Sequence, residues 1–206
     1  MAASYPVSRR PAPRGIVRGM GRTPGRLEGR RVAVLVEKLY EDLELHYPRL
    51  RLIEEGAEVH FVGPKAGETY LSKHGYPARS THAARSVRGG SYDAVVIPGG
   101  YAPDHMRRTP EMVKLVRDAH RTGAVLAAIC HGPWMLCSVP ESVRGRRLAC
   151  FFAIKDDVVN AGGIYLPDEA CHVDGNLITA RVPDDLPLFC AAIIETIAAR
   201  RPRSRK

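Results

Sequence analysis

The hydrophobic residues of this chain fall into short continuous runs that alternate with longer amphipathic stretches. The runs predict strands buried on both faces, because a strand covered on both sides carries no polar alternation. The stretches between them predict helices, and residues 63–80, which hold glycines and tyrosines, predict a hairpin or an irregular loop. The expected strands are residues 32–36, 59–62, 94–97, 124–129 and 177–180, and the expected helices are residues 42–55, 111–121, a segment from about 133, and 185–199.

Local signals support two of these helices. The first carries Leu43, Leu50 and Ile53 near helical spacing, which predicts its apolar face, and Gly56 marks its end. The helix at 111–121 has Thr109 as its expected N-cap and Pro110 at its first position. Strands that alternate with helices predict an α/β fold, a doubly wound and mostly parallel sheet with helices on both faces.

The positive charge of the chain is concentrated at its two ends. The chain has 206 residues and a formal net charge of +9, of which residues 1–31 contribute +7 and residues 200–206 contribute +5, so residues 32–199 carry −3. Residues 1–30 are rich in Arg, Pro and Gly, which predicts a disordered basic tail. A start codon assigned too early and an organelle transit peptide are the alternatives. We expect one domain at 31–199, a basic tail at 200–206, and an N-terminal tail whose removal leaves stability unchanged.

The composition excludes several classes of protein. No apolar run reaches the roughly 18 residues of a transmembrane helix, and no hydrophobic stretch near the N-terminus resembles a secretory signal. Arginines without interleaved aromatic residues supply only non-specific phosphate contacts, so we expect no specific nucleic-acid partner and no membrane partner. Five cysteines without a CxxC pair argue against a disulfide framework and a structural metal site, and favour a reducing, cytoplasmic location.

Residues that could take part in catalysis or binding follow three of the expected strands. Ligands bind at the carboxyl ends of the strands in open α/β sheets, so these residues are expected to converge. They are Glu37, Glu41, Asp42 and Glu44 after the first strand, Gly99, Gly100 and Asp104 after the third, and Cys130, His131 and Gly132 after the fourth.

Cys130 is the candidate nucleophile. Free cysteine is usually a buried structural residue, and that interpretation holds for the other four cysteines. Cys130 differs because it lies at a strand-to-helix turn, where unpaired N–H groups and the helix macrodipole favour a thiolate, so we expect a lowered pKa. A helix terminus supplies at most about 2 kcal/mol, so a strongly activated thiol needs a second donor. His131 or a protonated carboxyl group would serve, whereas an ionised carboxylate would raise the thiol pKa.

Six segments in order resemble the PfpI branch of the ThiJ/PfpI superfamily. The resemblance spans residues 32 to about 199, and no single segment would carry it alone. The segments are EDLELHYP at 41–48, LIEEG at 52–56, KHGY at 73–76, DAVVIPGG at 93–100, AICHGP at 128–133 and KDDVVNAG at 155–162.

The resemblance implies a flavodoxin-like sheet with a nucleophilic cysteine at Cys130 and an adjacent catalytic histidine at His131. It places the glutamate that bonds to the cysteine at Glu44, with Glu41 as the alternative. It also implies that a neighbouring subunit contributes an acidic residue to orient the histidine, and the matching position here is Asp104, where the family's proteases have glutamate. Phe151 stands where some relatives place a tyrosine.

These observations favour a cysteine-dependent enzyme of the glyoxalase or deglycase type that acts on small reactive carbonyls or glycated adducts in stress protection. We expect backbone N–H groups near Gly99, Gly100, His131 and Gly132 to hold the oxyanion, no metal or organic cofactor, and a homo-oligomer. An intracellular cysteine peptidase and a non-catalytic redox-sensing stress protein are the alternatives. A glutamine amidotransferase subunit is disfavoured, because the chain has no His-x-Glu pair after residue 181.

Overall fold

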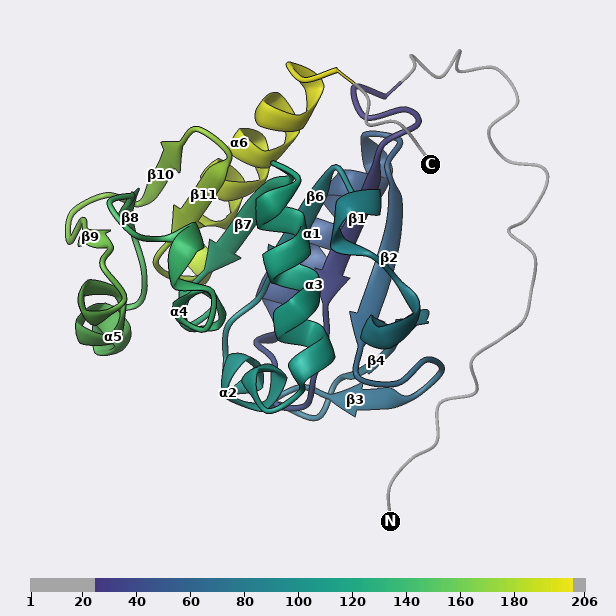
Figure 1. Ribbon diagram of the computed structural model, residues 1–206. Helices are drawn as coiled ribbons and strands as arrows, with labels where there is room; N and C mark the ends of the chain where they lie inside the picture. Colours follow the sequence, from purple (N-terminus) through teal and green to yellow (C-terminus); the bar gives the residue numbers. More distant parts are fainter. Residues whose placement is uncertain (1–24, 202–206) are drawn as a thin grey trace.

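A seven-stranded sheet forms the centre of the protein in a computed structural model that describes residues 25–201 (Figure 1). Its strand order is β10-β11-β7-β6-β1-β2-β5, and only the pairing of β10 with β11 is antiparallel. The strands are β1 (Arg31–Leu35), β2 (Glu58–Gly63), β5 (His82–Ala83), β6 (Ala94–Ile97), β7 (Val125–Ile129), β10 (Cys171–Asp174) and β11 (Leu177–Ala180).

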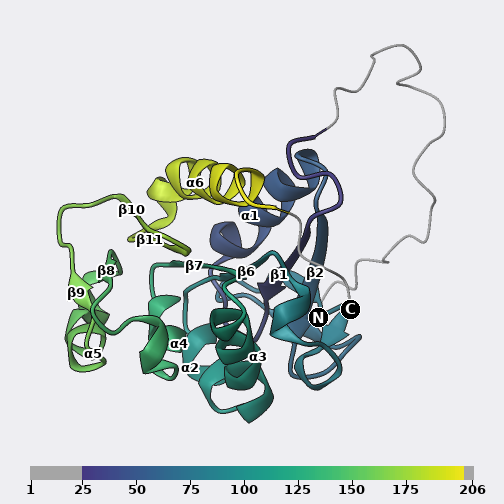
Figure 2. The ribbon, with the colours of Figure 1, turned by 45° about the horizontal axis from the view of Figure 1, so that its top comes forward.

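Helices cover both faces of this sheet. Figure 2 shows α1 and α6 on one face and α2, α3 and α4 on the other, which confirms the doubly wound, flavodoxin-like arrangement. Within residues 25–201, no helix is both long enough and apolar enough to cross a membrane. The helices are α1 (Asp42–Glu54), α2 (Ala102–Arg107), α3 (Pro110–Arg121), α4 (Pro133–Cys137), α5 (Lys155–Asn160) and α6 (Leu186–Ala198).

The central strands read as apolar runs because both of their faces are covered. Every residue of β6 and β7 is buried, as is every residue of β1 after Arg31. This burial anchors the strand ends, so the residues that follow β1, β6 and β7 are held at fixed positions along one edge.

Short elements complete the fold. The segment 63–80 forms the hairpin of β3 (Thr69–Leu71) and β4 (Pro77–Arg79), which confirms the hairpin alternative. The sequence pattern did not predict α2, α5, β10 or the parallel pair of β8 (Arg147–Leu148) and β9 (Ile164–Tyr165). Single 3-10 turns lie at Ala84–Ser86, Gly89–Ser91, Pro140–Ser142, Phe152–Ile154 and Pro183–Asp185.

The buried face of α1 differs from the expected one. Leu43, Leu50 and Ile53 are all exposed, and the helix instead buries Glu44, Leu45, Pro48 and Leu52. The prediction was wrong because it counted only apolar residues, whereas this helix directs a carboxyl group inward.

The packed domain begins before residue 31, so the predicted end of the N-terminal tail, residue 30, was too late in the chain. Leu27 is fully buried in the main core, and its N–H donates to the carbonyl of Glu55 at 2.8 Å. Arg30 is also buried and donates hydrogen bonds to Asp93 and to the carbonyl of Arg200. The remaining parts of the two predicted tails, residues 1–24 and 202–206, lie outside the described residues.

Candidate active site

Three neighbouring strands bring the candidate residues to one edge of the sheet. β6 lies between β1 and β7, and all three are parallel. Gly99, which follows β6, lies where they meet: a Cβ atom there would be 2.7 Å from Glu44 Oε2, 2.8 Å from the His131 nitrogen and 2.9 Å from Cys130 Cβ. The structure therefore brings Glu44, Cys130 and His131 together around a position that only glycine fits.

Cys130 occupies a sharp turn between β7 and α4. Its φ of +58° lies in the left-handed region, which costs a residue with a side chain roughly 1–3 kcal/mol. Its N–H donates to the carbonyl of Ala180 at 3.0 Å, and its carbonyl accepts from the N–H of Phe151 at 2.9 Å. Both bonds hold the turn in place, and the cysteine remains 9% exposed.

Glu44 supplies a buried carboxyl group beside this thiol. Its Oε2 accepts a hydrogen bond of 2.7 Å from the N–H of Gly99. Oε1 is buried and makes no hydrogen bond of regular geometry among the described residues, although the Cys130 thiol is close enough to lower the pKa of the carboxyl. Burial outweighs these contacts and raises the pKa of Glu44 to about 8.

Glu41, the alternative to Glu44, points elsewhere. Its carboxylate forms an ion pair with the ammonium group of Lys73. The charge of Glu41 still reaches Glu44, whose pKa it helps to raise. Of the two glutamates, Glu44 is therefore the one in contact with the thiol.

The pKa of Cys130 is raised, not lowered as expected from the sequence. Burial is the main cause and the charge of Glu44 the second, while the N–H groups of His131 and Gly100 act in the opposite direction. The helix contributes little, because α4 is a single turn of five residues. The thiol and the carboxyl thus titrate as a coupled pair that resists carrying two negative charges.

The backbone donors expected for an oxyanion separate into two groups. The N–H of Gly99 is bonded to Glu44, and the N–H of Gly132 is bonded to the carbonyl of Ile129 at 2.7 Å. Gly99 and Gly132 are therefore not free donors, contrary to the prediction. The N–H groups of Gly100 and His131 remain, and both are directed at the sulfur.

The imidazole of His131 lies next to the thiol. Its Nδ1 is 3.3 Å from Cys130 Sγ, and its ring stacks on Phe151 with centroids 4.8 Å apart. Burial, and secondarily the charge of Lys73, lowers the pKa of this histidine, so the neutral form dominates near pH 7. Among residues 25–201, no carboxylate forms an ion pair with His131.

Asp104, the residue expected to orient His131, is bound to another partner within this chain. It lies on α2, where its carboxylate pairs with Arg108, and His105 Nδ1 is 4.0 Å away. The segment before it is only partly exposed. Tyr101 is 65% exposed, but Ala102 and Pro103 are buried.

Lys73 also belongs to the site, although the sequence pattern did not assign it there. Besides pairing with Glu41, its charge lowers the pKa values of Glu44 and His131. The KHGY segment at residues 73–76 was the available signal, because it lies on the hairpin that packs beside the first strand-to-helix turn.

One group of possible metal ligands lies beside the site. Glu41, Asp42 and His74 place three ligand atoms within 4.8 Å of one another. Asp42 is already bonded to Ser72 and His74, and Glu41 to Lys73, so internal contacts account for the cluster.

Comparison with known proteins is consistent with this architecture. Residues 30–196 match the model of the DJ-1/PfpI family. The chain is 38% identical over 147 residues to "Deglycase PfpI" of Pyrococcus furiosus, which covers 71% of this chain and 87% of that protein. It is 33% identical over 171 residues to "Protein/nucleic acid deglycase 2" of Escherichia coli, which covers 82% of this chain and 99% of that protein.

A solved structure supports the same relationship. A two-domain protein of Anabaena variabilis with DJ-1/ThiJ/PfpI-like and ferritin-like domains aligns with a TM-score of 0.78 at 40% identity, over 86% of this chain and 52% of that one. The half of that protein that aligns matches almost the whole folded part of this chain. From its strand order, its cysteine turn and these matches, the chain belongs to the DJ-1/PfpI family.

Proposed function

We propose that the protein is a deglycase-type enzyme that uses Cys130 to attack small reactive carbonyls or their adducts with amines. The observation that carries this proposal is the arrangement around the sulfur. A buried carboxyl with a pKa of about 8, a neutral imidazole at 3.3 Å and two N–H groups surround one cysteine. Relatives named deglycase, at 33–38% identity, support the same class of reaction.

In the proposed mechanism, Glu44 in its ionised form accepts the thiol proton as the Cys130 sulfur bonds to the aldehyde carbon. The carbonyl oxygen gains the negative charge and receives hydrogen bonds from the N–H groups of Gly100 and His131. Protonation of that oxygen gives a hemithioacetal. The same carbon is attacked in a glycated adduct, from which the amine leaves as it takes up a proton.

Glu44 then moves a proton between two carbons. For a 2-oxoaldehyde, it removes the C1 proton of the hemithioacetal, and a proton is returned at C2, which converts the adduct to a thioester of a 2-hydroxyacid. Water hydrolyses the thioester, restores the thiol and releases the acid. A carboxyl group with a pKa near 8 suits both directions of this transfer close to neutral pH.

We also propose that the active form is a homo-oligomer in which Asp104 orients the His131 of a second copy. Two observations support this: His131 has no carboxylate partner within residues 25–201, and Asp104 is on a partly exposed helix. The cysteines of residues 25–201 are all free thiols. Free thiols are typical of a reducing compartment, which supports a proposed location in the cytoplasm.

The test measures loss of methylglyoxal and appearance of lactate, together with release of free amine from a glycated amino acid. We expect the Cys130→Ala and Glu44→Gln variants to lose at least 100-fold in rate, and the control Cys137→Ala to keep the rate of the unmodified protein. Retention of activity by Cys130→Ala would contradict the proposal.

Labelling provides a second readout. With sub-stoichiometric iodoacetamide we expect Cys130 to react first, although Cys137 and Cys171 are more exposed. Burial raises the pKa of both of these thiols to about 11, and neither has a carboxyl group placed to remove its proton. Peptide mapping by mass spectrometry identifies the first labelled cysteine. An enzyme that cleaves a labelled peptide faster than it consumes the carbonyl substrates would favour the peptidase alternative.

A further inference from the structure

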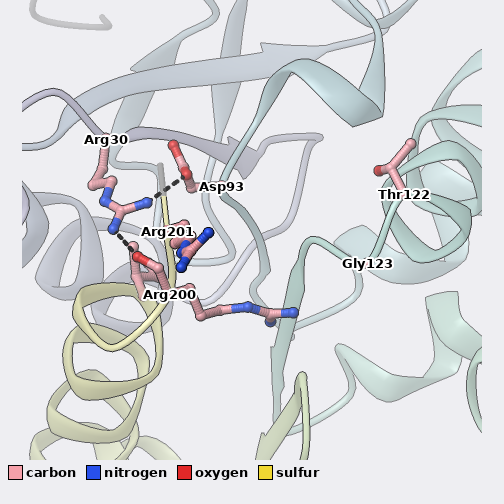
Figure 3. A pocket seen from close by; sticks show the side chains of 7 residues that line it. Arg30, Asp93, Thr122, Gly123, Arg200 and Arg201 are labelled. Carbon is pink, nitrogen blue, oxygen red and sulfur yellow. Dashed lines mark hydrogen bonds and ion pairs between the residues drawn. The ribbon is translucent and has the colours of Figure 1, made fainter. Parts of the chain in front are cut away.

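Two basic pockets lie outside the candidate active site, and they differ in how far their polar groups are already bonded. In the first, shown in Figure 3, Arg30 pairs with Asp93 at 3.1 Å and donates a hydrogen bond to the carbonyl of Arg200. These contacts tie the start of the described chain to the end of α6, so the fold itself accounts for this pocket. In the second pocket, several polar atoms have no partner within residues 25–201.

The second pocket has a volume of about 410 Å³, which is in the range of small-molecule sites. Two arginines, two histidines, two serines, one tyrosine and one valine line it, and no acidic residue does. These residues come from β1, β2, β5 and the segment between β5 and β6, and none of them belongs to the candidate active site. The pocket is therefore a separate feature of the protein.

The walls of this pocket are held in place by packing. Gly89 lies so close to α3 that a Cβ atom there would be 2.1 Å from the carbonyl oxygen of Leu115. The 3-10 turn Gly89–Ser91 therefore rests directly on that helix. Tyr92, the next residue, is 1% exposed. Fixed walls reduce the conformational entropy that is lost when a ligand binds.

His60 forms part of the wall and has no free nitrogen. Its ring stacks on that of His82, with centroids 4.0 Å apart and an interplanar angle of 21°. Its Nε2 is 2.9 Å from an oxygen of Glu58, and its Nδ1 is 3.1 Å from the hydroxyl of Tyr92. Because a carboxylate only accepts, Nε2 carries the hydrogen and donates to Glu58. These bonds fix the ring on which His82 is stacked.

His82 has one nitrogen without a partner. Its Nδ1 is 2.9 Å from the hydroxyl oxygen of Thr81, and that hydroxyl donates its only hydrogen to the carbonyl of Phe61 at 3.0 Å. The imidazole must therefore donate from Nδ1, and its Nε2 makes no hydrogen bond within residues 25–201. In the neutral ring Nε2 is an acceptor, so a proton there makes His82 a cation with a free donor.

Three further side chains bring unused donors to the pocket. Arg88 is exposed and forms no ion pair within the described part of the chain. Arg31 bonds to Glu58 through Nε at 3.1 Å, and its two Nη groups have no partner among the same residues. The exposed hydroxyl of Ser91 likewise makes no hydrogen bond within residues 25–201. The free donors thus come from β1, from β5 and from the segment that precedes β6.

Positive charge is concentrated around His82. Burial, and secondarily the charges of His60 and Arg31, lower the pKa of this imidazole. The charge of Glu58 acts in the opposite direction, but its two oxygens are bonded to Arg31 and His60. The other titratable groups that line the pocket are Arg88 and Tyr92. An anion in the pocket would therefore relieve the repulsion among these cations.

We propose that this pocket binds the phosphate group of a small, hydrophilic phosphate monoester. Such a group presents three acceptor oxygens, which suits donors that come from three parts of the chain, and arginine pairs with it through two parallel hydrogen bonds. The pocket is larger than a phosphate ion, and Val87 is the one apolar residue of its lining, so the rest of the ligand is small and polar. Binding includes the uptake of one proton at Nε2 of His82.

Isothermal titration calorimetry with glycerol 3-phosphate, inorganic phosphate and acetate at constant ionic strength tests the choice of ligand. We expect saturable binding of glycerol 3-phosphate, about threefold or more tighter than inorganic phosphate, because the ester fills more of the pocket. Acetate should bind about tenfold or more weakly than the ester, because a carboxylate has fewer acceptor atoms. An affinity for acetate or inorganic phosphate that equals that for the ester would overturn the proposal.

Substitutions distinguish the pocket from the general charge of the surface. Arg88→Gln should weaken binding of glycerol 3-phosphate about tenfold or more, the loss expected for a hydrogen bond between charged groups. The matched control is Arg85→Gln, which removes an exposed arginine of the same segment that does not line the pocket, and it should change Kd less than about twofold. Cys130→Ala should bind as the unmodified protein does, which separates this proposal from the proposed catalysis. Equal weakening by Arg88→Gln and Arg85→Gln would overturn the assigned site.

The proton at His82 provides an independent readout. The charge of sulfate is constant over the range in which histidine titrates, so sulfate should raise the pKa of His82 as measured by NMR of the imidazole protons. Arg88→Gln should reduce this increase, and His82→Gln should bind glycerol 3-phosphate about tenfold more weakly and without proton uptake. An unchanged pKa of His82 at high sulfate concentrations would overturn the proposal.

Discussion

The charge of Glu44 raises the pKa of the Cys130 thiol, while burial raises the pKa of Glu44 itself to about 8. The two side chains therefore share at most one negative charge near neutral pH, and the first proton to leave the pair is drawn mainly from the carboxyl group. In the mechanism proposed above, the thiol becomes nucleophilic when that ionised carboxylate accepts its proton. This coupling, and not a lowered thiol pKa, is the basis for the reactivity expected of the site.

The rate of alkylation of Cys130 should consequently increase with pH and reach a plateau, with an apparent pKa near 8. In Glu44→Gln the inflection near pH 8 should disappear, and the rate at that pH should fall at least tenfold, because no group remains to accept the thiol proton. Glu41→Gln serves as the control. It should keep the inflection and move it to lower pH, since the charge of Glu41 raises the pKa of Glu44. Iodoacetamide rates followed by mass spectrometry from pH 6 to 10 measure both effects, and an unchanged inflection in Glu44→Gln would assign it to another group.

Folding stability should also depend on the protonation of Glu44. The folded state holds this proton up to a pKa of about 8, whereas the unfolded chain releases it near 4.5. The stability associated with the protonated carboxyl is therefore complete below pH 4.5 and lost progressively as the pH rises to about 8. The loss is at most roughly 5 kcal/mol, at 1.36 kcal/mol per pKa unit.

Urea unfolding of the unmodified protein and of Glu44→Gln at pH 5, 7 and 9 isolates this contribution. The difference in free energy of unfolding should shift in favour of the glutamine variant as the pH increases. A difference that stays constant over this range would show that Glu44 has an ordinary pKa in the folded protein.

Mixed oligomers test whether Asp104 acts on a neighbouring copy. Asp104→Ala and Cys130→Ala chains should each be inactive alone, but a mixed dimer would contain one intact site with its own cysteine and the partner's aspartate. Activity should therefore return to roughly a quarter of the unmodified level after equal amounts exchange subunits, since half of the dimers are mixed and each has one site of two. Asp118→Ala, which removes a partly exposed carboxylate of α3, is the control and should be active by itself, without mixing. Light scattering that finds only monomers would exclude the shared site.

Leu27 should contribute strongly to stability although it lies in a segment that reads as a tail. Leu27→Ala removes a fully buried side chain and should lower the free energy of unfolding by about 2–4 kcal/mol. Leu43→Ala, at a position 57% exposed, should change it by less than about 0.5 kcal/mol. Denaturant unfolding distinguishes the two, and equal small effects would mean that residues 25–30 do not pack in solution.

Local sequence patterns predicted the elements that place the site. The apolar runs of β1, β6 and β7 could be recognised because full burial leaves almost no polar residue within them. The turn at Cys130 could be recognised because Cys-His-Gly-Pro directly follows such a run. The family resemblance placed Glu44 beside the thiol but left Glu41 as the alternative. The structure decides between them, because Glu41 pairs with Lys73 and Glu44 contacts Cys130.

Features that depend on tertiary packing could not be predicted from the sequence. The periodicity of α1 pointed to the wrong face, because its buried face includes a charged residue and its exposed face includes Leu43 and Leu50. Leu27 was hidden among arginines, prolines and glycines that dominate the local composition. The direction of the Cys130 pKa shift depends on the depth of burial and on the distance to the carboxyl group of Glu44 on α1. The spacing of residues along the chain encodes neither of these.

The left-handed backbone conformation of Cys130 favours glycine, whereas the proposed chemistry requires a thiol at the same position. Glycine adopts this conformation without strain, whereas a cysteine in the same turn raises the free energy of the folded state. Cys130→Gly should thus tolerate heat better than Cys130→Ala, although both lack the thiol. Thermal resistance alone would favour glycine at this position, so stability and the proposed reactivity of the thiol make opposite demands on residue 130.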